Sequence, residues 1–362
     1  MKKLKKVGLC VLICLVIAAI TGCGGTDGRE SSGTAATSEE TAASATPVSE
    51  QPIELDYAFF AAASTFPAKQ MEKWKEELEK RTNGKVKVNL FFGGSLLTDK
   101  NMYDGVKSGV ADIGSSVTTY EPGKFPLFSI VEAPTVFPNA LVSSQTAYNL
   151  LKEFTPDTFK DVKLITAFTS EPNFIQTKER VETIEDLHGM QLRVSGGLAP
   201  IISKLGATPV GMSQSEAVEA LQTGVVEGYV SSREVLRDLN FAEMVNYAVD
   251  YPLTLSIHAA VMNMDTWNSL PPDVQQVIDE LGPEMSAWTG EYMDNTAKES
   301  LQWAIEEHGF EVVALTPEEK ARWDELMKPI QDEIVADLQA QGLPAEEFKQ
   351  RLDELKEQFM KE

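Results

Sequence analysis

Cysteine and histidine are scarce in this sequence, and their scarcity argues against several kinds of site. The cysteines are Cys10, Cys14 and Cys23, all near the N-terminus, and the whole chain has three histidines. If the N-terminal segment is removed and Cys23 is modified, the mature domain keeps no thiol for a disulfide or a thiolate metal site. The histidines form no His-x-x-x-His pair. We therefore expect no metal, no cofactor and no catalytic site.

Basic residues are also few. The chain has 32 Lys and Arg against 55 Asp and Glu, a formal net charge of −23. Such an acidic chain repels phosphate backbones, so nucleic acid is not an expected partner. We interpret the acidity as a solvated surface, which says nothing direct about a small ligand.

Long hydrophobic runs are missing apart from one at the N-terminus. That run covers residues 7–20, follows four lysines, and is too short to span a bilayer comfortably as a helix. It ends in Ala19-Ile20-Thr21-Gly22-Cys23, which resembles a bacterial lipobox. The resemblance implies that residues 1–22 are a signal peptide and that Cys23 carries a diacylglycerol on its sulfur. An ordinary signal peptide with an incidental cysteine is the alternative.

A polar segment follows the cysteine. Residues 23–52 are mostly Ser, Thr, Ala, Gly and Glu, which cannot bury enough apolar surface to offset their ordering entropy. As a flexible coil the segment would reach on the order of 30 Å. We therefore expect a lipid-anchored tether that holds an extracytoplasmic domain near the cell membrane, in a periplasm or on the outer face of a bacterial cell.

The body of the chain has the periodicity of an α/β protein. Residues 53–59 and 85–92 alternate apolar and polar side chains, as strands do, and a helical pattern between them stops at Asn83-Gly84. The same order of strands and helices recurs from about residue 162. This order predicts two lobes with mainly parallel sheets and a ligand cleft at the carboxyl ends of the strands.

The expected fold is a two-lobed, periplasmic-binding-protein-like fold with a long helix bridging both lobes. About 310 residues after the tether also favour two domains. The boundaries that we assign are 53–170 plus 257–282 for lobe I, 171–256 for lobe II, 283–308 for the bridging helix, and 309–362 for the C-terminal helices.

Several segments, taken in order, resemble one known family: the solute receptors of tripartite ATP-independent periplasmic (TRAP) transporters. They are WKEELEKRTNG (74–84), FGGSL (92–96), DGVKSGVADI (104–113), EDLHGMQLRV (185–194), ALQTGVVEG (220–228) and the stretch from Met262 to Pro271. The resemblance implies two lobes that close on a hinge over an organic acid, most often a carboxylate. It also implies permease subunits in the membrane as partners. We expect a monomer.

Arg193 is the residue that we expect to hold the ligand. It ends a predicted strand and precedes a Ser-Gly-Gly loop. Its guanidinium is a planar fork that matches a carboxylate with two charge-assisted hydrogen bonds. In the family, the matching arginine grips the ligand carboxylate. A solvated arginine paired with a surface acid is the alternative interpretation.

Three positions depart from the family pattern. Asn173 stands where many members carry a second arginine, Ser231 where many carry asparagine, and Gln214 where many place an aromatic side chain against the ligand. A buried anion without a partner costs several kcal/mol, so the loss of one cation removes the partner of a second carboxylate. The pattern predicts a monocarboxylate, with a dicarboxylate or a sugar acid as the second choice.

Other candidates for the lining of the cleft come from their positions in loops. They are Ala61 and Ala62 after the first strand, Ser116 and Thr118 after Ile113-Gly114, and Tyr229, which could supply the missing aromatic wall. We expect His258 to be an ordinary core residue.

Three other functions remain open from the sequence. A ligand-sensing receptor for a signalling kinase would use the same fold. A receptor for an ATP-driven importer is disfavoured by the motifs. An exported hydrolase lacks an evident nucleophile and base.

Overall fold

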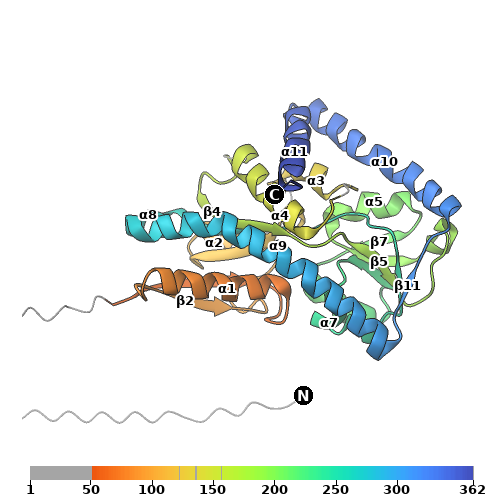
Figure 1. Cartoon of the computed structure of the whole chain (residues 1–362), viewed down its shortest axis with the longest axis horizontal. Helices are drawn as coiled ribbons and strands as arrows, with labels where there is room; N and C mark the ends of the chain where they lie inside the picture. The colour runs from red at the N-terminus through yellow and green to blue at the C-terminus, as the bar shows by residue number, and fades with distance from the viewer. Residues whose placement is uncertain (1–50, 122, 135–136, 156, 362) are drawn as a thin grey trace, which may run out of the picture. The chain divides into compact units, whose positions relative to one another are not determined.

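The computed structural model describes residues 51–121, 123–134, 137–155 and 157–361 (Figure 1). The expected signal peptide, Cys23 and nearly all of the expected tether lie outside these residues. The described chain is an α/β protein with two sheets, as the sequence predicted. We refer to the parts built around the first and second sheets as lobe I and lobe II.

The sheet of lobe I has five strands in the order β2-β1-β3-β10-β4. Their bounds are Ile53–Phe59 (β1), Val86–Phe91 (β2), Ile113–Val117 (β3), Val162–Thr169 (β4) and Ile257–Asn263 (β10). β1 is parallel to β2 and β3, whereas β10 is antiparallel to β3 and β4. The sheet is mixed rather than mainly parallel because β10 returns from lobe II and enters between β3 and β4.

The sheet of lobe II has six strands in the order β11-β9-β5-β8-β6-β7. Their bounds are Phe174–Thr177 (β5), Gln191–Val194 (β6), Thr208–Gly211 (β7), Gly228–Ser231 (β8), Tyr247–Val249 (β9) and Glu311–Val313 (β11). β6 runs parallel to β7 and β8, and β5 runs antiparallel to β8 and β9. β11 is also parallel to β9, so three of the five pairings are parallel, and this sheet is mixed with the expected parallel majority.

Helices cover both sheets. Before the long helix they are Phe66–Arg81 (α1), Met102–Lys107 (α2), Ser129–Glu132 (α3), Ala140–Phe154 (α4), Ala199–Lys204 (α5), Gln214–Gln222 (α6), Val235–Asp238 (α7) and Met264–Ser269 (α8). Short 3-10 turns are Thr118–Tyr120 (η1), Pro126–Phe128 (η2), Ile184–Leu187 (η3), Gly196–Leu198 (η4) and Phe241–Glu243 (η5). Proline in the first turn of α1 suits the fixed backbone angle that a helix start needs.

The long helix α9 spans Pro272–His308 and runs past both lobes, with contacts to α1, α4 and β4 at one end and to α7 at the other (Figure 1). It begins at Pro272 rather than at residue 283, because Pro283 lies inside the helix and does not start it. Next to that proline, the Thr166 hydroxyl donates a 2.7 Å hydrogen bond to the carbonyl of Gly282, which ties the helix to β4.

The C-terminal segment adds helices α10 (Pro317–Ala340) and α11 (Ala345–Phe359). α11 packs on α4, where the Phe348 ring lies edge-on to Phe128 and Phe154. The segment after residue 308 is not purely helical as expected, since β11 first joins β9 in the sheet of lobe II.

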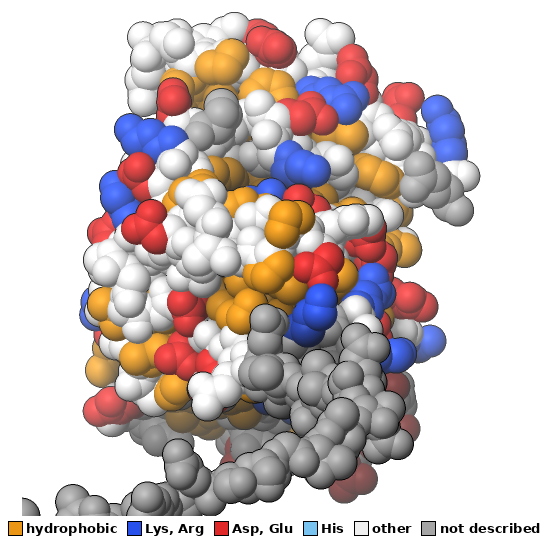
Figure 2. Space-filling view, turned by 90° about the vertical axis from the view of Figure 1, so that its left-hand side faces the viewer, with side chains coloured by type: hydrophobic (Ala, Val, Ile, Leu, Met, Phe, Trp, Pro, Cys, Tyr) orange, Lys and Arg blue, Asp and Glu red, His pale blue; other side chains and the backbone are white. Residues whose placement is uncertain are grey.

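The surface carries charges of both signs. On the face in Figure 2, acidic and basic side chains are interspersed, with apolar side chains between them. None of the helices in the described part of the chain has the length and apolarity that a membrane span needs.

Gly290 allows α9 and α4 to approach closely, and this generates a test of the fold. A Cβ atom at Gly290 would lie 2.6 Å from the Leu141 Cα and 2.7 Å from the Ala140 carbonyl oxygen, both backbone atoms. We expect Gly290→Ala to lower the free energy of unfolding by about 1–3 kcal/mol, the usual cost of overpacking. Denaturant unfolding measures this change.

The control is Gly196→Ala, because a Cβ there meets nothing within 4 Å. That variant should unfold at the wild-type denaturant midpoint. Equal midpoints for both variants would contradict the close approach of α9 to α4.

Candidate ligand-binding site

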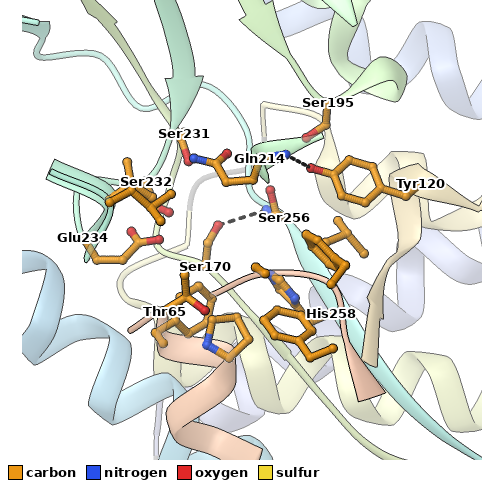
Figure 3. Close-up of a pocket in the computed structure, with 18 of the residues that line it drawn as sticks. Thr65, Tyr120, Ser170, Ser195, Gln214, Ser231, Ser232, Glu234, Ser256 and His258 are labelled. Carbon is orange, nitrogen blue, oxygen red and sulfur yellow. Dashed lines mark hydrogen bonds between the residues drawn. The ribbon is translucent and has the colours of Figure 1, made fainter. Parts of the chain in front are cut away.

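A cavity lies between the two lobes, at the carboxyl ends of β1, β3, β6 and β8. It encloses about 550 Å³ of space, including open solvent at its mouth. Lobe I and the chain crossings contribute Phe59, Phe60, Ala61, Thr65, Phe66, Pro67, Val117, Tyr120, Ser170, Ser256 and His258. Lobe II contributes Arg193, Ser195, Gln214, Val230, Ser231, Ser232, Glu234, Val235 and Leu239 (Figure 3).

Arg193 lies on β6 and is only 1% exposed. Its Nε and Nη2 donate to the Met212 carbonyl at 3.1 and 2.9 Å. The same Nη2 donates to the Tyr120 hydroxyl at 2.9 Å, and Nη1 donates to Oε1 of Gln214 at 2.6 Å. All these acceptors are neutral. Within the part of the chain that the structure describes, no carboxylate forms an ion pair with Arg193.

Unused hydrogen-bond donors surround this guanidinium. A guanidinium has five N–H groups, and the contacts of Arg193 with the described residues leave one N–H of Nη1 without an acceptor among them. Nε2 of Gln214 is buried and has no partner among the described residues. The Tyr120 hydroxyl accepts from Arg193 and from the Gln214 backbone N–H at 3.0 Å, so its own proton remains to be donated. The three groups together suit an anion.

Tyr120 also joins the two lobes. It belongs to η1 of lobe I, whereas both of its hydrogen-bond partners belong to lobe II (Figure 3). Its ring lies edge-on to Phe60, with 5.6 Å between the ring centroids. The polar end of the cavity is therefore assembled from both lobes.

A second arginine close to the cavity is already neutralised. Nε and Nη2 of Arg233 donate to the two carboxylate oxygens of Glu171 at 2.9 and 2.7 Å, and the guanidinium lies over the Phe174 ring. This bidentate ion pair leaves Arg233 little capacity for a ligand.

The structure places four of the sequence-predicted residues at the cavity: Arg193, Gln214, Ser231 and Ala61. Ala62 is exposed and does not line it. The other predicted positions lie elsewhere, for reasons that differ from residue to residue.

Asn173 forms its hydrogen bonds with the other chain segment that crosses between the lobes. Its backbone N–H pairs with the Thr254 carbonyl, and its side-chain amide donates to the Thr254 hydroxyl at 3.0 Å and to the Ser256 hydroxyl at 3.4 Å. The position expected to face a second ligand carboxylate therefore fastens the two crossing segments instead.

Tyr229 is fully buried in the core of lobe II rather than at the cavity. Its hydroxyl donates to Oε1 of Gln176 at 2.8 Å, and its ring packs edge-on to Phe241. The prediction that it replaces a missing aromatic wall was wrong. Phe60, Phe66 and Tyr120 of lobe I supply aromatic walls instead.

Ser116 and Thr118 lie behind the cavity wall. Successive side chains of a strand point to opposite faces, so Val117 lines the cavity while its two neighbours face away from it. Ser116 donates to Glu121 at 3.1 Å, and Thr118 donates to Glu132 and to the Ile257 carbonyl. The strand runs on to Val117, so Ser116 lies in β3 and Thr118 in η1, and neither lies in the predicted loop or lines the cavity.

His258 lines the cavity, although no pattern in the sequence placed it there. Its ring stacks on Phe168 at 5.2 Å and meets Phe66 edge-on, while its Nδ1 is buried without a partner among the described residues. Burial lowers the pKa of His258 to about 3. The imidazole is therefore neutral at physiological pH.

Glu234 is the other cavity residue that the sequence analysis missed. It is 3% exposed, and its Oε2 has no hydrogen-bond partner in the described part of the chain. Burial, together with the nearby acids Asp238 and Glu171, raises the pKa of Glu234 to about 8, against a hydrogen bond from Ser232. Among the described residues, no cluster of histidine, cysteine and acidic side chains could hold a metal ion.

The family described as bacterial extracellular solute-binding protein, family 7, matches residues 57–338. This chain belongs to that family. It is therefore a solute-binding protein of the TRAP type and not an enzyme, and the resemblance seen in the sequence motifs is confirmed.

Individual relatives agree with this assignment. The C4-dicarboxylate-binding periplasmic protein of Rhodobacter capsulatus is 24% identical over 320 residues, which cover 83% of this chain and 91% of that protein. A TRAP periplasmic solute-binding protein of Desulfovibrio salexigens is 42% identical, with a TM-score of 0.75 and coverage of 84% and 96%. One from Rhodoferax ferrireducens, solved with copurified benzoate, has a TM-score of 0.80 at 23% identity, with coverage of 85% and 99%.

The buried histidine gives a pH test that needs no ligand. The unfolded chain protonates His258 near its ordinary pKa of 6.5, whereas burial holds the folded pKa at about 3. Its contribution to stability is therefore complete above pH 6.5 and is lost as the pH falls. Against the non-titrating variant His258→Phe, wild-type unfolding free energy should fall by about 1.4 kcal/mol per pH unit between about pH 6 and 4.

Denaturant unfolding of both proteins across that pH range measures the difference. Phenylalanine keeps a ring for stacking on Phe168. The other titrating groups are the same in both proteins, so their contributions cancel in the comparison. Parallel pH profiles would show that the pKa of His258 is the same in the folded and unfolded protein, and would contradict its burial.

Proposed function

We propose that this chain is an extracytoplasmic receptor that captures a small organic acid between its lobes and delivers it to a TRAP-type secondary transporter. The observation that carries the proposal is the buried guanidinium of Arg193, which faces a cavity and has only neutral partners. A buried cation without a counter-ion costs several kcal/mol. A ligand carboxylate would supply that counter-ion.

A single carboxylate suits the charges that line the cavity. Arg193 is the one basic side chain among the described lining residues, and the nearby Arg233 is paired with Glu171. A second carboxylate would find no second lysine or arginine among the described lining residues. These charges support a monocarboxylate over a dicarboxylate, although the R. capsulatus relative is named for C4-dicarboxylates.

Two similar solved structures support a ligand that carries a carboxylate. The R. ferrireducens protein holds benzoate, a monocarboxylate. The D. salexigens protein was solved in an open form with the C-terminus of a symmetry mate in its ligand-binding site, and the end of a polypeptide chain carries a carboxylate.

Hinged closure is the mechanism that we infer. The two crossing segments are joined by backbone hydrogen bonds, such as Ser170 N–H to the Ser256 carbonyl at 2.9 Å, so they would bend together. Ligand favours the closed state because only there do Tyr120 of lobe I and Arg193 of lobe II contact it at once. Delivery to the permease would follow from recognition of that closed form.

Arg193→Lys tests the guanidinium. Lysine keeps the positive charge but loses the planar fork, so affinity for a bound monocarboxylate should fall by about tenfold to a hundredfold. Isothermal titration calorimetry with benzoate, mandelate, hexanoate and phenylpropanoate measures the fall, after native mass spectrometry has identified any acid that copurifies.

The control is Arg180→Lys, since Arg180 is an exposed arginine of the same lobe that pairs with Glu182 and Glu311. It should bind like the wild type. Succinate and malate are titrated alongside, and micromolar affinity for either would contradict the monocarboxylate preference. Unchanged carboxylate binding by Arg193→Lys would contradict the proposed role of Arg193.

We further propose that the receptor is held at the cell membrane by lipid on Cys23. This residue lies outside the described part of the chain, so the support is the sequence pattern alone: a basic start, a short apolar run and a lipobox-like ending. Several lipid-borne CH₂ groups at about 0.8 kcal/mol each would anchor the protein.

Cys23→Ser tests the anchor. In a bacterial host, the wild type should partition into detergent and carry the mass of a diacylglycerol, while the variant should stay in the aqueous phase. Cys14→Ser is the matched control and should still be lipidated, because residue 14 lies in the segment expected to be removed. Detergent partitioning that is the same for wild type and Cys23→Ser would contradict the anchor.

A further inference from the structure

A second buried polar group faces the cavity, and the proposed function leaves it without a role. Glu234 is the residue that precedes α7, and its carboxyl group is buried with Oε2 unpartnered among the described residues. In Figure 3 this carboxyl group points toward the middle of the cavity, across from Tyr120. A buried acid with an oxygen that has no hydrogen-bond partner, at the wall of a ligand cavity, indicates a contact with the ligand.

The surroundings of Glu234 are acidic. Asp238 and Glu171 both act on its carboxyl group, and Ser232 supplies its one side-chain hydrogen bond. The arginine nearest in sequence, Arg233, is held by Glu171 in a bidentate ion pair. Within the described ranges, no lysine, arginine or histidine forms an ion pair with Glu234. Arg233 acts on Glu234 only through space, so what the Glu234 carboxyl group lacks among the described residues is a positive charge in direct contact.

The cavity therefore has a polar group at each end that lacks a partner of the opposite charge among the described residues. Arg193 lacks an anion and Glu234 lacks a cation, while Phe66, Leu239 and Val235 provide apolar lining. An anion alone would meet the first requirement and leave the second. A molecule with a carboxylate, an apolar body and an ammonium group would meet both.

We propose that Glu234 binds a protonated amine, so that the solute is an amino acid-like zwitterion whose carboxylate is held by Arg193. This inference rests on the proposed function and narrows it: the ligand still has one carboxylate, but its net charge is zero. An ammonium is favoured over a hydroxyl because it would supply both a hydrogen bond to the unpartnered Oε2 and the direct positive charge that ionised Glu234 lacks among the described residues.

Binding of such a ligand is linked to a proton. Glu234, with its pKa raised to about 8 by burial, is mostly protonated at neutral pH in the empty cavity. The ammonium stabilises the ionised carboxylate, so the carboxyl proton passes to the buffer as the ligand binds. A ligand with a hydroxyl in place of the amine would accept the neutral acid as it is and release no proton.

The experiment compares acids that differ only by an amine. The pairs are hexanoate and its ω-amino derivative, phenylpropanoate and phenylalanine, and para-toluate and para-(aminomethyl)benzoate, which place the amine at different distances from the carboxylate. For at least one pair, calorimetry should show about tenfold or tighter binding of the amine, the worth of one charge-assisted hydrogen bond. Equal or weaker binding of the amine in every pair would overturn the inference.

Glu234→Gln keeps the size of the side chain but cannot ionise. It should remove the preference for the amine while leaving amine-free acids bound, and Arg193→Lys should weaken both members of each pair. The control Glu243→Gln alters an exposed acid of the same lobe and should keep the preference. A preference that survives Glu234→Gln would overturn the role of Glu234 while leaving the carboxylate receptor intact. Failure of the wild type to bind any of the acids would overturn both proposals.

A measurement on the wild type guards against misfolding of the variant. Titration of the preferred amine at pH 7 in two buffers of different ionisation enthalpy should reveal release of about one proton per ligand. Its amine-free partner and a hydroxyl analogue should release none. Tight binding of the amine without proton release would show that the ammonium does not meet the Glu234 carboxyl group.

Discussion

A guanidinium buried without a counter-ion can persist only where neutral acceptors satisfy its N–H groups. For Arg193 the decisive acceptor is the Met212 carbonyl, which takes two of those bonds. The pairing of β6 with β7 sets Val194 opposite Gly211, and the backbone N–H of Met212 donates to the carbonyl oxygen of Val194 at 3.1 Å. The register of two short strands thus fixes the arginine, and the charge that it leaves uncompensated defines which end of the cavity is positive.

The same arginine ties ligand binding to the relation between the lobes. One of its partners, Tyr120, comes from lobe I, and that tyrosine also accepts from the backbone of Gln214 in lobe II. Closure of the lobes would therefore complete the polar end of the cavity at the moment when it excludes water. The low dielectric that results strengthens each charge-assisted bond to the ligand, so capture and closure favour one another.

The sequence predicted the residues of this site that follow from strand ends. Arg193, Gln214, Ser231 and Ala61 all lie just at or after a strand, where ligands bind in α/β sheets. It misplaced Ser116, Thr118 and Tyr229. Ser116 and Tyr229 lie inside β3 and β8 and Thr118 lies in η1, and a position near a predicted strand end does not reveal which way a side chain faces. Glu234 and His258 were missed for another reason: their burial depends on the packing of α7 and on the rings around β10, neither of which has a local pattern in the sequence.

The charges around the cavity fall into two groups with different consequences. Arg233 and Glu171 neutralise each other, so their energy is the same whether or not a ligand is present. Among the described residues, Arg193 has no counter-ion and the mostly protonated carboxyl group of Glu234 has one oxygen without a partner, and the cost of burying both groups is carried by the empty protein. Both belong to lobe II and can contact a ligand in the open form too, so the differential affinity that shifts the balance toward the closed form comes from added contacts of lobe I, such as Tyr120, while these two groups select the solute. Specificity should accordingly be encoded in the unpaired charges, and a member of the family that changes Glu234 should change its solute even if Arg193 is kept.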